Sequence, residues 1–234
     1  MKNTAVRWLF STRLLAWFEI LISKLLRKMN LIVLSYNDPE RSEVLKMINE
    51  VKRERHMLLD RIEGYQLFMA VKKTEKVKGD IVEVGVYTGG SARIICEAMG
   101  NRVLHLFDTF EGIPQVQEID SKKFAIGMFS ASIESVKDYL KKYRNVHFYR
   151  GLFPDTAEPI KDKKFSLVNL DVDTYESTLN CLKFFYPRMS LGGVLVSHDY
   201  NSAKGVRKAF DEFFSDKPEP VIELCGSQCL FVKI

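Results

Sequence analysis

Short apolar runs and stretches of helical spacing alternate along the chain from Gly79 onward. Such alternation is typical of a parallel sheet covered by helices, because each parallel connection needs a crossover. The apolar runs predict strands near Ile81–Val84, Val103–Phe107, Val146–Tyr149, Ser166–Leu170 and Val194–Ser197. The segments of helical spacing predict helices near Ser91–Met99, Ile133–Tyr143, Glu176–Tyr186 and Lys204–Phe214.

Two further apolar runs follow near the end of the chain, at Val221–Leu224 and Cys229–Val232, with Gly226 between them. The gap is too short for a helical crossover, so these runs predict an antiparallel hairpin. The whole pattern predicts a Rossmann-like α/β fold. Its seven-stranded sheet should be mostly parallel and should end in this C-terminal hairpin.

The residues before the sheet show no strand pattern. After the turn signal Asn37-Asp38-Pro39, apolar residues recur at helical spacing from Glu40 to Lys76 and predict two or three helices. We therefore expect three regions: a basic amphipathic N-terminal helix over 1–36, a helical lead-in that covers the substrate over 37–78, and the ligand-binding α/β domain over 79–234.

The N-terminal segment from Trp8 to Leu26 is apolar, but Arg13, Glu19 and Lys24 interrupt it. No uncharged run reaches the roughly 18 residues that a membrane-spanning helix needs, and no signal-peptide cleavage site follows. Six basic residues face one acid among the first 30 residues. Two interpretations stay open: peripheral contact with an anionic membrane, or packing on the domain or on a second subunit. The expected location is cytoplasmic, with contact at the inner face of the membrane under the first interpretation.

The composition indicates which classes of molecule the chain is expected to bind. Lys and Arg number 35 against 30 acids, but much of the excess lies at the front of the chain, and no aromatic-interleaved basic stripe follows. This distribution predicts no nucleic-acid partner. The four cysteines form no CxxC pair, which argues against a zinc or redox motif and favours a reducing compartment.

A glycine-rich turn follows the first predicted strand, in the sequence GDIVEVGVYTGGSARII. Glycines let the chain turn sharply and let a ligand approach the backbone, while the next helix offers unpaired N–H groups. The dinucleotide fingerprint GxGxxG is absent. An acid at the strand end suits the ammonium of S-adenosylmethionine better than a pyrophosphate. A tight turn without ligand is the alternative. The candidate cofactor residues here are Glu83, Gly85, Tyr87, Gly89, Gly90 and Ser91.

The second strand ends in Asp108, about 25 residues after Glu83. An acid at this place in a βαβ unit can accept the ribose hydroxyls of a nucleotide-like ligand. Asp108 therefore completes the predicted cofactor site.

Polar residues also follow the fourth and fifth predicted strands, in LDVDTYEST and VLVSHDYN. Strand ends of a parallel sheet share one edge, so Asp171, His198 and Asp199 should converge. They could hold a divalent metal, and Asp171 could act as a base on a hydroxyl. Asp173 is assigned mainly a structural role, because Asp173 or Thr174 would suit the N-cap of the following helix.

At these residues the chain resembles the macrocin O-methyltransferase family, whose members methylate deoxysugar hydroxyls of macrolide and aminocoumarin antibiotics. The resemblance begins near Arg61 and runs through GDIVEVGVYTGGS, FDTFEGIP, GLFPDT, LDVDTYEST, YPRMSLGGVLVSHDY and GVRKAFDEFF. It implies a class I methyltransferase fold, S-adenosylmethionine as methyl donor, and a divalent metal, usually magnesium. It also implies a small-molecule or glycan acceptor, and a homo-oligomer that uses the N-terminal region.

The resemblance places Glu83 and the Gly85–Ser91 turn in the cofactor loop, and Asp108 on the ribose. Asp171 matches the family's metal ligand and proposed base. His198-Asp199 stands where the family has paired aspartates. Since imidazole suits manganese better than magnesium, either ion is expected here.

Two other functions are compatible with these residues. The first is O-methylation of a catechol or other small phenol, and the second is a non-catalytic Rossmann-like scaffold in a membrane-associated glycan-assembly complex. A scaffold has no need of four acids at one edge of the sheet, which argues against it.

The loop over 112–128 has the length and position of a lid over the cofactor.

Overall fold

The computed structural model describes residues 39–234, so the predicted helix over 1–36 lies outside the described residues. Residues Val44–Ile234 form one compact unit. Within residues 39–234, no helix is long and apolar enough to cross a membrane. All four cysteines lie in this part of the chain and are unpaired, with only Cys225 exposed.

One seven-stranded sheet runs through the unit in the order β3-β2-β1-β4-β5-β7-β6. The first five strands are parallel, and β7 pairs antiparallel with both β5 and β6, as the sequence predicts. The strands are β1 (Asp80–Val84), β2 (Leu104–Asp108), β3 (Val146–Arg150), β4 (Phe165–Leu170), β5 (Met189–Ser197), β6 (Ile222–Glu223) and β7 (Cys229–Val232).

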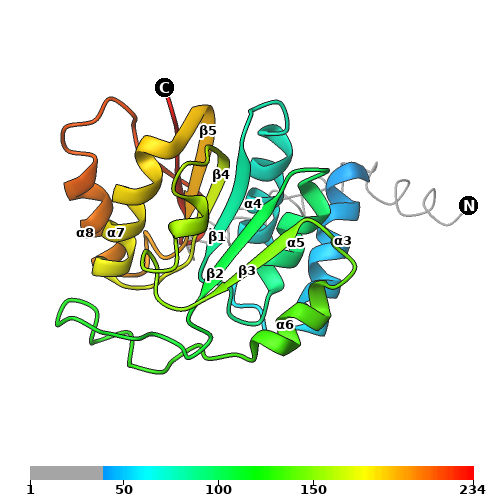
Figure 1. Cartoon of the computed structure of the whole chain (residues 1–234), viewed down its shortest axis with the longest axis horizontal. Helices are drawn as coiled ribbons and strands as arrows, with labels where there is room; N and C mark the ends of the chain where they lie inside the picture. Colours follow the sequence, from blue (N-terminus) through cyan, green and yellow to red (C-terminus); the bar gives the residue numbers. More distant parts are fainter. Residues whose placement is uncertain (1–38) are drawn as a thin grey trace, which may run out of the picture. The chain divides into compact units, whose positions relative to one another are not determined.

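Helices cover both faces of this sheet (Figure 1). On one side lie α4 (Arg61–Lys73), α5 (Gly90–Ala98) and α6 (Ile133–Leu140), and on the other lie α7 (Tyr175–Phe185) and α8 (Lys204–Phe213). Two α-helices precede the sheet in the described residues, α3 (Pro39–Glu54) and α4. Two short 3-10 helices, η1 (Glu158–Ile160) and η2 (Tyr186–Arg188), complete the unit.

The core lies between the sheet and its helices. Every residue of the central strand β4 is buried, because helices cover both of its faces. On the α7 side, phenylalanine rings pack against each other, with Phe185 centred 5.0 Å from Phe153 and 5.4 Å from Phe165. A rigid, densely packed sheet of this kind holds the strand ends in defined positions.

Strand register brings the carboxyl ends of four strands to one edge. Val84 pairs with Phe107 and with Leu170, and Leu170 pairs with Ser197. Backbone hydrogen bonds continue one residue past the strands: the Asp171 amide donates to the Val84 carbonyl at 2.9 Å, and the His198 amide donates to the Leu170 carbonyl at 2.8 Å. The residues that follow β1, β2, β4 and β5 are therefore neighbours.

Candidate active site

The turn after β1 is built around Gly85. This residue has φ +88°, and a Cβ added to it would lie 1.8 Å from the carbonyl oxygen of Asp171. Only glycine fits there, because the chain after β1 passes directly against the chain after β4. The next residues run into α5, for which Gly89 is the N-cap. The predicted turn is present, and it is tight because it passes directly against Asp171 after β4.

Asp108 supports this turn from the end of β2. Its Oδ2 accepts hydrogen bonds from the backbone amides of Val86 (2.6 Å) and Tyr87 (2.8 Å). Its Oδ1 accepts one from the amide of Phe110, at 2.6 Å. A carboxylate offers about four acceptor positions, so the remaining capacity of Asp108 lies mainly at Oδ1. The side chain lines the cavity described below.

Glu83 lies beneath the turn. It is fully buried within β1, and its Oε1 accepts a hydrogen bond from Asn169 Nδ2 at 2.9 Å. Burial raises the pKa of Glu83 to about 8. It is not among the residues that line the cavity. The structure therefore places Glu83 where it supports the turn from inside the sheet, and a role for it in cofactor binding stays a prediction.

A cavity of about 320 Å³ opens over this edge of the sheet. That volume is in the range of small-ligand sites. Its walls include the turn with Asp108, residues 151–153 after β3, the polar residues after β4 and β5, and two loops from elsewhere in the chain. Among them are Gly85, Tyr87, Gly90, Ser91, Asp108, Asp171, Asp173, His198 and Asp199. The loops contribute residues 56–59 and parts of 112–129.

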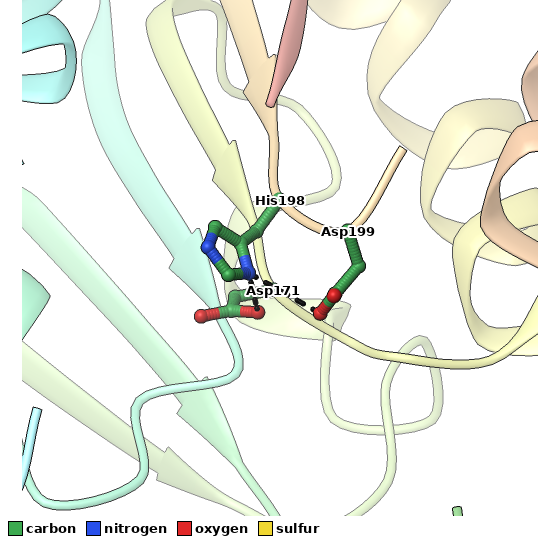
Figure 2. Close-up of side chains that lie close together, drawn as sticks. All are labelled: Asp171, His198 and Asp199. Atoms are coloured by element: carbon green, nitrogen blue, oxygen red, sulfur yellow. Dashed lines mark hydrogen bonds and ion pairs between the residues drawn. The ribbon is translucent and has the colours of Figure 1, made fainter. Parts of the chain in front are cut away.

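The predicted metal-binding residues lie close together (Figure 2), and all three line this cavity. One donor atom each from Asp171, His198 and Asp199 lies within 4.8 Å of the others. His198 Nδ1 lies 3.3 Å from Asp171 Oδ1 and 3.2 Å from Asp199 Oδ2. Two carboxylates and one imidazole that converge at this spacing form a donor set suited to a divalent cation.

Three carboxylates, those of Glu63, Asp171 and Asp199, lie around His198. Burial by itself would lower the pKa of His198, but Asp171, Asp199 and Glu63 raise it far above its ordinary value. The Glu63 contact joins His198 Nε2 to Glu63 Oε2 at 3.2 Å. Burial opposes ionisation of Asp199, yet hydrogen bonds from His198 and Lys123 hold its pKa well below the usual range. Lys123 Nζ lies 2.6 Å from Asp199 Oδ1.

Two residues of this site were missed by sequence reasoning. Lys123 lies within the predicted lid over 112–128, and nothing in its local sequence indicates a contact with Asp199. Glu63 belongs to a capping box with Asp60, in which Glu63 Oε2 accepts from the Asp60 amide at 2.9 Å. The spacing of Asp60 and Glu63 predicts only a helix start. The sequence therefore gives no sign that Glu63 lies beside His198.

The start of α7 confirms the predicted N-cap position at Thr174, but the capping side chain is a different one. Thr174 occupies the N-cap position, but its side chain makes no capping hydrogen bond, and neither does Asp173. The carboxylate of Asp120 caps the helix instead, since its Oδ2 accepts from the Tyr175 amide at 3.1 Å. Asp173 has φ +64° and lines the cavity, where burial and the charges of Asp171 and Asp199 raise its pKa.

Comparison with known proteins identifies the family of the chain. The model of the macrocin-O-methyltransferase (TylF) family matches residues 56–228, which include every residue of the site. The chain belongs to the macrocin O-methyltransferase family. This membership confirms the resemblance that the sequence motifs indicate.

Three curated relatives are O-methyltransferases by name. The 8-demethyl-8-(2,3-dimethoxy-alpha-L-rhamnosyl)-tetracenomycin-C 4'-O-methyltransferase of Streptomyces olivaceus is 30% identical over 161 residues, 61% of this chain and 60% of the relative. The demethyldecarbamoylnovobiocin O-methyltransferase of Streptomyces niveus is 30% identical over 58% of each chain. The mycinamicin III 3''-O-methyltransferase of Micromonospora griseorubida is 28% identical over 53% of this chain and 56% of its own. The chain thus spans about three fifths of the length of these macrocin O-methyltransferase relatives.

Solved structures show the same fold. The O-methyltransferase NovP is 26% identical, with a TM-score of 0.68 over 81% of this chain and 88% of its own. The calicheamicin methyltransferase CalS11 is 18% identical, with a TM-score of 0.63 over 85% of this chain and 94% of its own. These likenesses confirm the class I methyltransferase fold predicted for residues 79–234.

Proposed function

We propose that this member of the macrocin O-methyltransferase family transfers the methyl group of S-adenosylmethionine to a sugar hydroxyl on a glycosylated small molecule. One observation carries the proposal: the glycine turn with Asp108 and the converging Asp171, His198 and Asp199 face the same cavity. A donor bound at the turn and an acceptor bound at the acids would therefore be adjacent.

The cofactor half of the proposal rests on the turn. The amino-acid end of S-adenosylmethionine would lie against Gly85–Ser91, where the turn leads into α5 and the first backbone N–H groups of that helix have no intrahelical partner. Asp108 Oδ1, with its remaining acceptor capacity, would take a ribose hydroxyl. Tyr87, whose hydroxyl lies 3.1 Å from His56 Nδ1, would close the site from the side.

The acceptor half rests on Asp171. Its side chain is 24% exposed and reaches the cavity, so it can accept a proton from a bound hydroxyl. In the reaction, the hydroxyl oxygen forms a bond to the methyl carbon while the carbon–sulfur bond breaks and its electron pair goes to sulfur. The hydroxyl proton passes to Asp171, and the products are a methyl ether and S-adenosylhomocysteine. Correct alignment of the two reactants supplies much of the rate.

Asp171, His198 and Asp199 would hold the divalent cation that the family resemblance implies. Such a cation, when bound, supplies positive charge that lowers the pKa of the acceptor hydroxyl. Because one donor is an imidazole, we expect manganese to support activity at least as well as magnesium. Nδ1 of His198 lies near carboxylate oxygens of both Asp171 and Asp199, so the three donor groups are close enough to share one cation.

A binding experiment tests the cofactor site. Calorimetry should detect binding of S-adenosylhomocysteine to the wild-type chain, and Asp108→Ala should weaken it by about 1.5–3 kcal/mol, the scale of hydrogen bonds to a charged group. Asp138→Ala is the matched control, because Asp138 is 73% exposed on α6 and pairs only with Lys141. Unchanged affinity in Asp108→Ala would remove Asp108 from the site, and absence of binding in the wild type would favour a scaffold.

An acceptor panel tests the substrate class. The chain is incubated with S-adenosylmethionine and either sugar nucleotides and glycosylated small molecules, or catechols. Methyl ethers should form on the sugars. Products on catechols alone would show that the acceptor class differs from that of the named relatives.

The metal assignment has its own test. Asp171→Asn should abolish methyl transfer, because it removes a ligand and the base together. His198→Asp should shift the preference from manganese to magnesium, since all three ligands would then be hard oxygens. Full activity of the wild type in excess chelator would leave Asp171 as a base that acts without a metal.

A further inference from the structure

Glu63 makes more contacts than a helix cap needs. It is 6% exposed at the start of α4, and in the capping box its Oε2 accepts from the Asp60 amide. Its Oε1 accepts from the amide of Ser227 at 2.7 Å and from the hydroxyl of Ser227 at 2.8 Å. Its Oε2 also lies 3.2 Å from His198 Nε2. Capping accounts only for the first of these contacts.

Three separate elements hold this carboxylate in place. Asp60 lies at the start of α4, Ser227 lies in the turn between β6 and β7, and His198 follows β5. The neighbouring turn residue Gly226 makes room for it, since a Cβ there would lie 2.6 Å from Glu63 Oε1. Ser227 Oγ also accepts from the Asp199 amide at 3.3 Å, which links Glu63 to a second residue of the metal site.

The contacts of Glu63 indicate which ring nitrogen of His198 carries a hydrogen. Every other partner of the Glu63 carboxylate donates a hydrogen, so the carboxylate acts as an acceptor towards His198 as well. A hydrogen on Nε2 satisfies that acceptor, which leaves Nδ1 as the nitrogen that faces Asp171 and Asp199. Histidine ligands commonly donate their other N–H to a carboxylate, which fixes ring orientation and raises basicity.

We propose that Glu63 is a positioning residue for the metal site: its carboxylate holds the Nε2–H of His198, so that Nδ1 binds a divalent cation together with Asp171 and Asp199. This inference rests on the metal assignment in the proposed function. It gives His198, the residue that differs from the family's paired aspartates, a partner on α4 that is 135 positions away in the sequence.

A double-mutant cycle on manganese affinity tests the proposal. Mn²⁺ binding to the full chain is measured by electron paramagnetic resonance for the wild type, Glu63→Gln, His198→Asp and the double variant. Glu63→Gln should weaken Mn²⁺ binding by about 10- to 100-fold, as loss of an outer carboxylate usually does. In the His198→Asp background the same change should alter the affinity by no more than about twofold, because Glu63 acts through the imidazole.

Asp60→Ala is the matched control for helix capping. Asp60 is exposed and caps α4 through its Oδ1, but makes no contact with His198. This variant should lower thermal stability and leave Mn²⁺ affinity unchanged. Equal losses of Mn²⁺ affinity from Glu63→Gln in both backgrounds, or an equal loss in Asp60→Ala, would show that Glu63 serves only the fold and would overturn the proposal.

Nitrogen-15 NMR of the Zn²⁺-loaded chain gives a readout that does not depend on affinity. Long-range correlations of His198 should show a hydrogen on Nε2 and the cation on Nδ1, and the reverse assignment would overturn the proposal. Failure of the proposed function gives a different result from failure of the role of Glu63. Absence of Mn²⁺ binding in a chain that still transfers methyl groups overturns the role of Glu63 alone, whereas an intact cycle in a chain that transfers none overturns the methyltransferase.

Discussion

Gly85 is the residue at which the backbone is most constrained. The carbonyl of Asp171 approaches it so closely that a Cβ would lie 1.8 Å away, and its φ of +88° is itself unfavourable for other residues. The contact joins the cofactor turn to the residue that we propose as the base. The distance between donor and acceptor sites is therefore set in part by the absence of one side chain.

A pair of alanine substitutions separates these two constraints. Gly127 has a similar φ of +83°, but nothing lies within 4 Å of a Cβ added there. Gly127→Ala should lower the free energy of unfolding by roughly 1–2 kcal/mol, the cost of a left-handed backbone. Gly85→Ala should cost about 3 kcal/mol or more, because the clash is with backbone, and it should also impair S-adenosylhomocysteine binding. Urea denaturation gives both values, and equal costs would contradict the close approach.

At the scale of elements, the segment between β2 and α6 connects parts of the site that are distant in the sequence. It runs as a long loop without helix or strand (Figure 1). Asp120 caps the start of α7, and Lys123 donates to Asp199. Buried side chains of Ile113 and Phe124 line the cavity from this loop. The predicted lid over 112–128 is thus attached to the start of α7 through Asp120 and to Asp199 through Lys123.

Removal of the Asp120 cap should loosen this loop. Asp120→Ala should lower the free energy of unfolding by about 0.5–2 kcal/mol, as other N-cap deletions do. Limited proteolysis should then cut the segment over 112–128 faster, because its attachment to α7 is lost. Asp120→Asn keeps an oxygen acceptor for the Tyr175 amide and should retain most of the protection. If both variants resist protease as well as the wild type, the cap does not hold the loop.

Contacts of Glu219 also join the residues after β7 to the 3-10 helix η2. The side chain of Glu219 is 0% exposed, and it pairs with Lys233 after β7. Tyr186 of η2 donates to Glu219 Oε2 at 2.7 Å. Burial opposes ionisation of Glu219, but the hydrogen bonds from Lys233 and Tyr186 lower its pKa to about 2. The ionised carboxylate therefore stabilises the folded chain.

Because the pKa of Glu219 is lowered in the folded chain, the free energy of unfolding depends on pH. The stabilisation is complete above the ordinary pKa of 4.5 and is lost as pH falls towards about 2, because the unfolded chain takes up the proton first. Glu219→Gln cannot titrate. The difference in unfolding free energy between wild type and variant should therefore shrink over this window, in urea titrations at successive pH values. A difference that stays constant through the window would contradict the assignment.

For the molecule as a whole, the N-terminal region carries an untested prediction. Residues 1–36 lie outside the described structure, and their basic and aromatic composition motivates contact with an anionic bilayer. Deletion of the residues before Asn30 should abolish co-sedimentation with anionic liposomes and leave S-adenosylhomocysteine binding intact. If the full chain does not sediment with these liposomes, the segment serves packing or a second subunit.

Much of the architecture is readable from the sequence. The order of strands and helices, the antiparallel end of the sheet and the residues at the strand ends all follow from local patterns. Apolar runs mark buried strands, and chain connection lengths decide parallel or antiparallel pairing. Asp108, Asp171, His198 and Asp199 were located in this way, because parallel strands end at one edge.

Tertiary structure alone decided which side chains contact these residues. Glu63 meets His198 across 135 positions, Lys123 meets Asp199 across 76, and Asp120 rather than Asp173 caps α7. It also placed Glu83 inside the sheet instead of on the cavity wall. Local periodicity records which face of an element is buried, but it carries no information on which distant element packs against that face. Contacts of this kind arise only when helices and loops dock on the finished sheet.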